Sequence, residues 1–268
     1  MQLLDGKIAR AHYTAILKEK IAQLSIVPCL LIIQVGDRSD STSFIKSKKK
    51  FATEIGTKEI HINLDEKIRQ NELIEIIKKY NNDKTVQGII VQLPLPMHLN
   101  VDNIINNIDS GKDVDGLTKN TKFTPATARG ISELFDFYSI DPQGKKVTIL
   151  GKSKLVGIPI AEMCMARGAI VTVCHSQTEN IQEKTKDADI VIVAIGRANH
   201  IDLKYINKGQ IVIDVGINRV GDKIVGDVDF DSVKDIVSMI TPVPGGVGQM
   251  TVLSLFENLV DACYNLKN

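Results

Sequence analysis

The sequence predicts two α/β domains with a cleft between them. Helical and strand patterns alternate along the 268 residues, and repeated βα units are typical of a parallel sheet with right-handed crossovers. Uninterrupted apolar runs, L-L-I-I at 30–33 and G-I-I-V at 88–91, are typical of strands buried on both faces of such a sheet. The polar, threonine-rich stretch over 116–125 indicates a passage from one domain to the next.

The first domain is expected over residues 1–120. A helical pattern over 7–24 leads into an apolar strand, after which helices and strands alternate. The expected strands are 29–35, 59–64 and 88–92, and the later helices are about 41–55 and 72–80.

The second domain is expected over 121–268. A helix near 131–138 precedes a second βα series, and the cleft between two such domains is the default place for a ligand. The expected strands are 146–150, 170–174, 190–194 and 210–215. Three further helices are expected: one that begins near Ile158, one over about 180–188 and a last one over about 252–264.

The composition is that of an ordinary globular protein and excludes several functions. Hydrophobic residues make up 43% and charged residues 24% of the chain, which argues against disorder. A net charge of +1 gives no basic field for nucleic acid, and 4% aromatic residues without tryptophan offer few stacking platforms. No apolar run approaches the roughly 20 residues that cross a bilayer. We therefore expect no nucleic-acid partner and no membrane.

The spacing of cysteine and histidine indicates neither a disulfide framework nor a metal centre. The four cysteines form no C-x-x-C pair and lie mostly in apolar runs, so we expect buried, reduced thiols. The start, M-Q-L-L-D-G-K, has no secretory h-region or cleavage site, and we expect a cytoplasmic protein. No pair among the five histidines has metal-ligand spacing, and we assign no metal.

A glycine turn in the second domain predicts a dinucleotide site. The expected strand 146–150 runs into G-K-S-K-L-V-G-I-P at 151–159 and then into a helix, whose free N–H groups are suited to a phosphate. The spacing departs from G-x-G-x-x-G because Ser153 replaces the second glycine, and a plain tight turn is the competing interpretation.

The end of the next strand, 170–174, favours NADP over NAD. An NAD site has a carboxylate there that accepts hydrogen bonds from the ribose hydroxyls. This strand ends C-H-S-Q-T with no acid before Glu179, whereas Ser176 and the nearby Lys152 could hold a ribose phosphate. The alternative is that Ser176 caps a turn and Lys152 is merely solvated.

A series of motifs runs in order along nearly the whole chain. They are D-G-K at 5–7, V-G-D at 35–37, S-K-K-K at 47–50, V-Q-L-P-L-P at 91–96, K-D-V-D-G at 112–116, the glycine turn, V-I-D-V-G-I-N-R at 212–219, V-G-D-V-D-F at 225–230 and T-P-V-P-G-G-V-G at 241–248. On these motifs the chain resembles the bifunctional methylenetetrahydrofolate dehydrogenase/methenyltetrahydrofolate cyclohydrolase family, the bacterial FolD type.

The resemblance implies a homodimer that works in one-carbon folate metabolism. Such an enzyme oxidises 5,10-methylene-tetrahydrofolate to the methenyl cation with NADP and then adds water to give 10-formyl-tetrahydrofolate. It implies a catalytic, folate-binding N-terminal domain and a Rossmann-like NADP-binding C-terminal domain, with the folate in the cleft. The last helix is then expected to pack back on the N-terminal domain.

The same resemblance assigns residues to these tasks. It places the catalytic lysine at Lys48, the glutamine of Q-L-P-L-P at Gln92 and the pterin-binding aspartate at Asp115. The further substrate-binding residues that it implies are Phe44, Leu93, Pro94, Pro244 and Gly245. The NADP contacts that it implies are Gly151, Lys152, Ser153, Ser176 and Ile217, with Thr127 as an addition.

The sequence makes three departures from the pattern of this family. Phe44 replaces a Tyr, P-A-T-A at 125–128 replaces P-C-T-P, and Gln249 replaces the proline of G-P-M-T. Because Phe cannot donate the hydrogen bond of Tyr, Phe44 opens the alternative of a dehydrogenase with weak or no cyclohydrolase activity. The other two bear on loops of the cofactor side, where Thr127 and Thr251 are retained.

Two other functions compete with this interpretation. Another two-domain NADP oxidoreductase, such as a shikimate-dehydrogenase-like enzyme, predicts no folate affinity, and Q-L-P-L-P and T-P-V-P-G-G argue against it. A non-catalytic folate or nucleotide sensor on the same fold would not need Lys48, Gln92 and Asp115 together. Taken alone, S-K-K-K at 47–50 is typical of a solvated helix face, and we expect no more than solvation or attraction of the folate glutamate for its other lysines.

Overall fold

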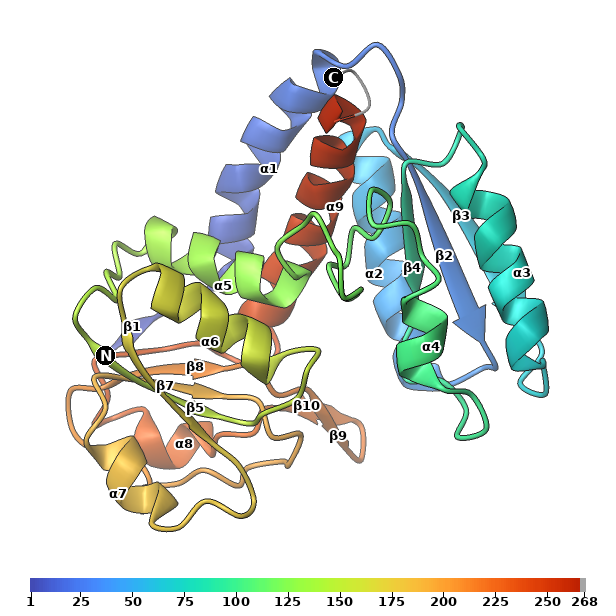
Figure 1. Cartoon of the computed structure of the whole chain (residues 1–268). Helices are drawn as coiled ribbons and strands as arrows, with labels where there is room; N and C mark the ends of the chain where they lie inside the picture. The colour runs from blue at the N-terminus through green and yellow to red at the C-terminus, as the bar shows by residue number, and fades with distance from the viewer. Residues whose placement is uncertain (266–268) are drawn as a thin grey trace. The chain divides into compact units, whose positions relative to one another are not determined.

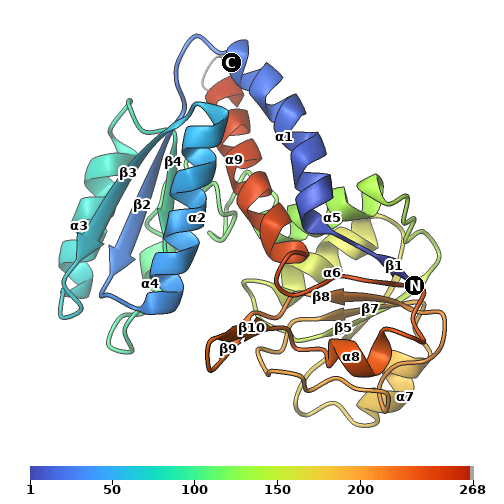
Figure 2. The same ribbon diagram turned by 180° about the vertical axis from the view of Figure 1, so that it is seen from behind.

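The chain folds into two compact units. The computed structural model describes residues 1–265, apart from the side chains of residues 39 and 40. One unit consists of residues 1–12 and 127–251 and is called the six-stranded unit, after its sheet. The other consists of 13–126 and the chain from 252 onward and is called the three-stranded unit. Figures 1 and 2 show the elements of both units from opposite sides.

The six-stranded unit is built on a parallel sheet with the strand order β1-β11-β8-β7-β5-β6. Its strands are β1 (Gln2–Leu3), β5 (Lys146–Leu150), β6 (Ile170–Cys174), β7 (Ile190–Val193), β8 (Ile211–Asp214) and β11 (Met239–Ile240). Its helices are α5 (Ala126–Phe137), α6 (Gly157–Ala166), α7 (Ile181–Lys186) and α8 (Phe230–Val233), and β9 (Asn218–Val220) forms a hairpin with β10 (Lys223–Val225). Both views place α5 and α6 on one face of the sheet and α7 and α8 on the other (Figures 1 and 2).

The first residues of the chain belong to this sheet. β1 pairs in parallel with β11, and Gly6 N donates to the carbonyl of Gly245 at 2.8 Å. The sequence predicts residues 1–12 in the first domain, whereas the structure groups them with 127–251. The reason lies in β1, since a strand of two residues shows no alternation along the sequence and is recognised only by its pairing.

The three-stranded unit holds a parallel sheet in the order β3-β2-β4. Its strands are β2 (Cys29–Val35), β3 (Lys58–Leu64) and β4 (Gly88–Val91), and its helices are α2 (Ser39–Ile55), α3 (Gln70–Asn81) and α4 (Val101–Ile105). Every residue of the central strand β2 is buried, as its unbroken apolar run predicts.

Two long helices run through the ends of the chain, α1 (Gly6–Ala22) and α9 (Val247–Asn265). The later part of α9 belongs to the three-stranded unit, where Asn258 Nδ2 donates to the carbonyls of Val114 and Thr124 at 2.8 and 2.9 Å. Leu253, Phe256 and Leu259 of this helix are buried. The helix thereby covers apolar surface and holds the loop between α4 and α5 in place.

Glycines account for the main difference in helix boundaries. α5 begins at Ala126 rather than near 131, and α9 begins at Val247 rather than near 252. Gly130 and Gly248 lie near the starts of these helices and weaken the helical pattern of the sequence. Gly130 is needed there, because a Cβ atom on it would lie 2.9 Å from Met250.

Candidate active site

Lys48 and Gln92 meet in the three-stranded unit. Lys48 lies on α2, Gln92 directly follows β4, and Lys48 Nζ donates to Gln92 Oε1 at 2.9 Å. Gln92 Nε2 donates to the carbonyl of Leu93 at 2.8 Å, and Gln92 N donates to Ile33 O at 2.8 Å. The amide nitrogen is thus bound elsewhere, which leaves the amide oxygen for the lysine. The structure therefore brings together two of the residues predicted to be catalytic.

The loop between α4 and α5 carries Asp115 and is shaped by its neighbour Asp113. The carboxylate of Asp113 is 1% exposed and accepts the backbone N–H groups of Gly116, Leu117 and Thr118 at 3.2, 3.2 and 2.8 Å. Asp113 is thus the cap of this loop. Asp115 itself is half-buried.

The pKa values of Lys48 and Asp115 are shifted in the directions that favour the neutral form of each side chain. Burial lowers the pKa of the Lys48 ammonium, and the negative charge of Asp115 opposes that shift without reversing it. Burial likewise raises the pKa of the Asp115 carboxyl, with Lys48 opposing and Asp113 adding to the effect. An amine held in this way loses its proton more easily than a solvated lysine, as a proton acceptor requires.

The remaining substrate residues implied by the sequence fall in both units. Phe44 lies on α2 one turn before Lys48 and is half-buried, as the predicted helix requires. Leu93 and the exposed Pro94 follow Gln92 and are joined by a cis peptide bond. Pro244 and Gly245 belong to the six-stranded unit, between β11 and α9.

The loop between β5 and α6 carries three of the expected cofactor residues. Gly151 has φ = +117°, and a Cβ atom there would collide with the carbonyl of Ala194, so only glycine fits. Lys152 and Ser153 are exposed. The Ser153 hydroxyl accepts the N–H groups of Val156 and Gly157 at 3.2 and 3.3 Å and so caps the start of α6.

The other expected cofactor residues include two at the same edge of the sheet. β5 pairs in register with β6, Leu150 opposite Cys174, so Ser176 follows a strand end beside the glycine loop. Ser176 is exposed and makes no hydrogen bond within residues 1–265, and Thr178 Oγ1 instead accepts the His175 N–H of that turn. Ile217 is exposed after β8, and Thr127 lies in the first turn of α5. No acidic residue stands at the end of β6.

Three buried acids were not predicted from the sequence. Asp113, Asp214 and Asp227 are 1%, 3% and 0% exposed. Each belongs to a motif that was recognised, K-D-V-D-G, V-I-D-V-G-I-N-R or V-G-D-V-D-F, but no function was assigned to it. The signal was a carboxylate beside glycines, which is typical of a side chain that collects backbone N–H groups.

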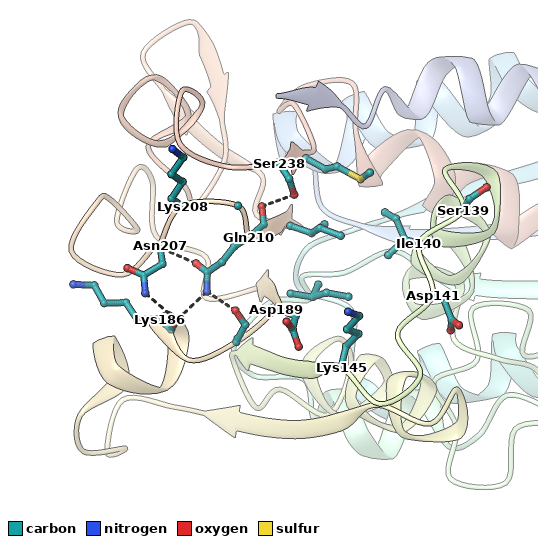
Figure 3. Close-up of a pocket in the computed structure, with 15 residues that line it drawn as sticks. Ser139, Ile140, Asp141, Lys145, Lys186, Asp189, Asn207, Lys208, Gln210 and Ser238 are labelled. Atoms are coloured by element: carbon teal, nitrogen blue, oxygen red, sulfur yellow. Dashed lines mark hydrogen bonds between the residues drawn. The ribbon is translucent and has the colours of Figure 1, made fainter.

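A hollow of about 600 Å³ lies at the opposite, amino-terminal ends of β5, β7 and β8 (Figure 3). Lys145, Asp189 and Gln210 line it, and it contains none of the predicted site residues. Gln210 Nε2 donates there to the carbonyls of Thr185 and Ala188 at 2.7 and 2.6 Å, so this amide is engaged in holding the local backbone. The candidate active site lies elsewhere.

Two classes of site are absent from the described residues. No set of three or more His, Cys, Asp or Glu side chains within 1–265 is arranged to hold a metal ion. None of the helices in the same range combines the length and hydrophobicity that crossing a bilayer requires.

Comparison with known sequences assigns both parts of the chain. The family model described as the catalytic domain of tetrahydrofolate dehydrogenase/cyclohydrolase matches residues 4–115, and the model of its NAD(P)-binding domain matches residues 125–267. The chain belongs to this family. It is 44% identical to the bifunctional protein FolD of Streptococcus agalactiae over 275 residues, which cover 97% of each chain.

Solved structures agree with this assignment. The FolD methylenetetrahydrofolate dehydrogenase/cyclohydrolase of Campylobacter jejuni superposes with a TM-score of 0.95 at 45% identity and 99% coverage of both chains. The Trypanosoma brucei enzyme, solved with NADP and an inhibitor, gives a TM-score of 0.94 at 30% identity, covering 99% of this chain and 98% of that one. Shikimate dehydrogenase of Aquifex aeolicus, at 11% identity and a TM-score of 0.57, shares only the fold. The family found is thus the one that the motifs indicated.

Proposed function

We propose that this chain oxidises 5,10-methylene-tetrahydrofolate with NADP and hydrolyses the methenyl product to 10-formyl-tetrahydrofolate. Both activities belong to the family, and the FolD relatives at 42–44% identity carry the name bifunctional. The comparisons therefore do not favour the alternative of a dehydrogenase without cyclohydrolase activity. The observation that carries the proposal is the bond from Lys48 to Gln92, next to the charge of Asp115.

The oxidation asks little of the protein's side chains. A folate nitrogen donates its electron pair to the methylene carbon as the hydride leaves, so no general base is needed. NADP supplies the hydride acceptor when it is bound. The protein's task is to hold the folate and the dinucleotide in a reactive geometry, which is a matter of proximity and orientation.

The hydrolysis does require a proton acceptor. Water that attacks the methenyl carbon must lose a proton, and Lys48 Nζ is the proposed acceptor because burial lowers its pKa. A neutral amine keeps two N–H donors, so it can retain its bond to Gln92 Oε1 while its lone pair takes the proton. Gln92 orients the amine without adding charge, which would otherwise raise the pKa of Lys48 again.

The folate is proposed to bind to the three-stranded unit. Asp115 is half-buried and is the proposed hydrogen-bond partner of the pterin ring, while Phe44, Leu93 and Pro94 supply apolar contact. Pro244 and Gly245 are the remaining substrate-binding residues of the proposal. In this proposal the three-stranded unit is the catalytic domain, and its α9 segment is part of it.

The carboxyl edge of the six-stranded sheet is the proposed NADP site. Gly151 lets the backbone approach the pyrophosphate closely. The first N–H groups of α6 are bonded to Ser153, so the proposed contact to the pyrophosphate is the glycine turn itself. The exposed Lys152 and the free hydroxyl of Ser176 suit the ribose phosphate, and no carboxylate stands there to repel it. Ser153, Ile217 and Thr127 complete the proposed set. The residues present therefore fit NADP.

Two properties of the whole protein are part of the proposal. We infer a homodimer, in line with the resemblance of the chain to its family, and light scattering of the purified protein tests this. We also infer a cytoplasmic location, which is supported by four free, buried cysteines such as remain reduced in that compartment.

A single assay tests the proposed function. Methylene-tetrahydrofolate and NADP are mixed with the protein, and the absorbance of methenyl-tetrahydrofolate is followed. We expect the absorbance to rise and then decay faster than in a sample without protein, and the same assay with NAD should show a lower kcat/KM. No methenyl product with either cofactor would refute the dehydrogenase assignment, and equal efficiency with both would refute the preference for NADP.

A further inference from the structure

Two buried carboxylates, Asp214 and Asp227, lie at the carboxyl edge of the six-stranded sheet and have no part in the chemistry described above. Asp214 is the last residue of β8, and Asp227 follows the β9–β10 hairpin. They are 3% and 0% exposed, and neither has an ion-pair partner within residues 1–265. A buried carboxylate without a cation is costly unless hydrogen bonds replace those to water.

Asp227 gathers its hydrogen bonds from two segments of the chain. Its Oδ2 accepts the N–H groups of Ile195 and Gly196 at 2.7 and 2.9 Å, and its Oδ1 accepts those of Arg197 and Asn218 Nδ2, both at 2.8 Å. A carboxylate has about four lone-pair sites, and four donors occupy them. Asp227 thereby ties the loop after β7 to the segment after β8.

Asp214 in turn holds Asp227 in place. Its Oδ1 accepts the backbone N–H groups of Gly216 and Asp227, both at 3.0 Å, and its Oδ2 accepts that of Val228 at 2.9 Å. The packing leaves no free space, since a Cβ atom on Gly226 would collide with the Asp214 carboxylate and one on Gly216 with that of Asp227. The two acids and the two glycines form one interlocked arrangement.

This arrangement supports the backbone of the NADP site. The loop 195–197 directly follows Ala194, whose carbonyl is packed against Gly151 of the glycine turn. Ile217, an expected cofactor contact, lies between Gly216 and Asn218, both of which bond to the acids. Residues 195–197 and 216–218 thus depend on the same pair of side chains.

We propose that Asp214 and Asp227 are positioning residues for the cofactor, which hold 195–197 and 216–218 in the conformation that receives the dinucleotide. The inference rests on the proposed function, since it requires NADP at this edge of the sheet. A merely structural role would affect both activities and the folding of the unit. A positioning role affects NADP binding and leaves the hydrolysis of methenyl-tetrahydrofolate intact, because that step uses Lys48 of the other unit.

The test uses the full chain with Asp227→Asn. The amide replaces an acceptor oxygen by a donor that faces N–H groups, so the loops lose their fixed conformation. We expect the Kd and KM for NADP to rise at least about tenfold, which corresponds to about 1.4 kcal/mol. We expect kcat at saturating NADP to stay within about threefold of the wild type. Hydrolysis of added methenyl-tetrahydrofolate without NADP should be unchanged.

Two further variants serve as control and as independent test. Asp222→Asn removes the same charge from the turn of the hairpin, where the Asp222 side chain is fully exposed, and should keep the wild-type affinity for NADP. Gly216→Ala changes no charge but displaces Asp227, and should reproduce the loss of NADP affinity. If Asp227→Asn does not fold, Asn218→Ala serves as the test in its place. Because it removes about one hydrogen bond, we expect a three- to tenfold loss of affinity for NADP.

Two results would overturn the inference. One is wild-type NADP affinity in Asp227→Asn, and the other is a parallel loss of NADP affinity and hydrolysis in a folded variant. The Kd is measured by calorimetry without turnover, so it tests the positioning role even if the wild type does not oxidise methylene-tetrahydrofolate. A wild-type protein that does not oxidise methylene-tetrahydrofolate would refute the proposed function and not the positioning role.

Discussion

A lysine that accepts a proton has to be partly neutral, and the surroundings of Lys48 favour this state. The residue is on a helix with other lysines, yet its Nζ is bound to Gln92 Oε1 and burial lowers its pKa. Lys46 on the same helix is exposed. Position and hydrogen bonding therefore separate one lysine from its neighbours in a charge-rich segment.

Lys48→Met tests the division of the two reactions. The substitution keeps the length of the side chain and removes the nitrogen that accepts the proton. Hydrolysis of methenyl-tetrahydrofolate should fall about 10²–10⁴-fold, whereas the oxidation should suffer less because it depends on positioning. Lys46→Met is the matched control and should leave both rates unchanged. Equal losses of both activities would mean that Lys48 serves binding rather than hydrolysis.

Asp115→Asn should move the pH dependence of hydrolysis. The carboxylate of Asp115 raises the pKa of Lys48 against the larger effect of burial, so its removal lowers that pKa further. Hydrolysis needs the neutral amine, and its rate therefore rises with pH through the pKa of Lys48. We expect this limb of the kcat profile, measured at saturating methenyl-tetrahydrofolate and corrected for background decay, to shift to lower pH. A shift to higher pH would contradict the assignment.

Phe44→Tyr should strengthen the hydrolysis. Phe44 and Lys48 are four residues apart on α2 and share a face, but Phe cannot donate a hydrogen bond. A hydrogen bond gained here is worth about 0.5–1.5 kcal/mol, so the cyclohydrolase rate should rise by up to about tenfold, with a smaller change in the dehydrogenase. The decay rate of added methenyl-tetrahydrofolate measures this. An unchanged rate would mean that the site is already adapted to Phe44.

At the scale of elements, the sequence predicts what is long and periodic. The strands 29–35, 146–150 and 170–174 were predicted with the bounds that the structure shows, because each is an apolar, β-branched run between polar segments. β1 and β11, of two residues each, have no period and exist through their partners. Pairing between segments that are distant in the sequence cannot be predicted from local periodicity.

The same distinction applies to the site. The resemblance named Lys48 and Gln92, and the structure joins them by a hydrogen bond. The resemblance did not show which acid of K-D-V-D-G caps the loop, because that depends on which side chain turns inward. The bond from Asp227 N to Asp214 spans 13 residues and a hairpin, and no spacing rule predicts it.

Gly88→Ala tests the packing of α9 against β4. A Cβ atom on Gly88 would lie 2.8 Å from both Leu259 Cδ1 and Val114 Cγ1, which are themselves buried. Overpacking of this kind costs about 1–3 kcal/mol, so the urea midpoint should fall. Gly111→Ala is the control, because its new methyl meets only the end of the Asp109 side chain. Equal midpoints for the two variants would argue against a close contact between α9 and β4.

For the molecule as a whole, the burial of its thiols predicts slow chemical modification. All four cysteines are free and buried, and burial raises the pKa of Cys164 to about 12. Thiolate is the reactive form, so the native protein should react slowly with a disulfide reagent at pH 8. Titration in denaturant should then reveal four thiols per chain. Rapid reaction of the native protein at one equivalent would show that at least one of these cysteines is accessible.

The division of the chain between its two units has a consequence for biosynthesis. β1 leaves the ribosome first, but its partner β11 appears only after most of the chain has been made. The carbonyls of Val114 and Thr124 likewise gain their hydrogen bonds from Asn258 only after the last helix has been made. Although domains commonly fold in order as they emerge, neither unit here is complete as a continuous stretch. A nascent chain that ends before α9 lacks Leu253, Phe256 and Leu259, so the apolar surface that these residues cover stays exposed until synthesis is complete.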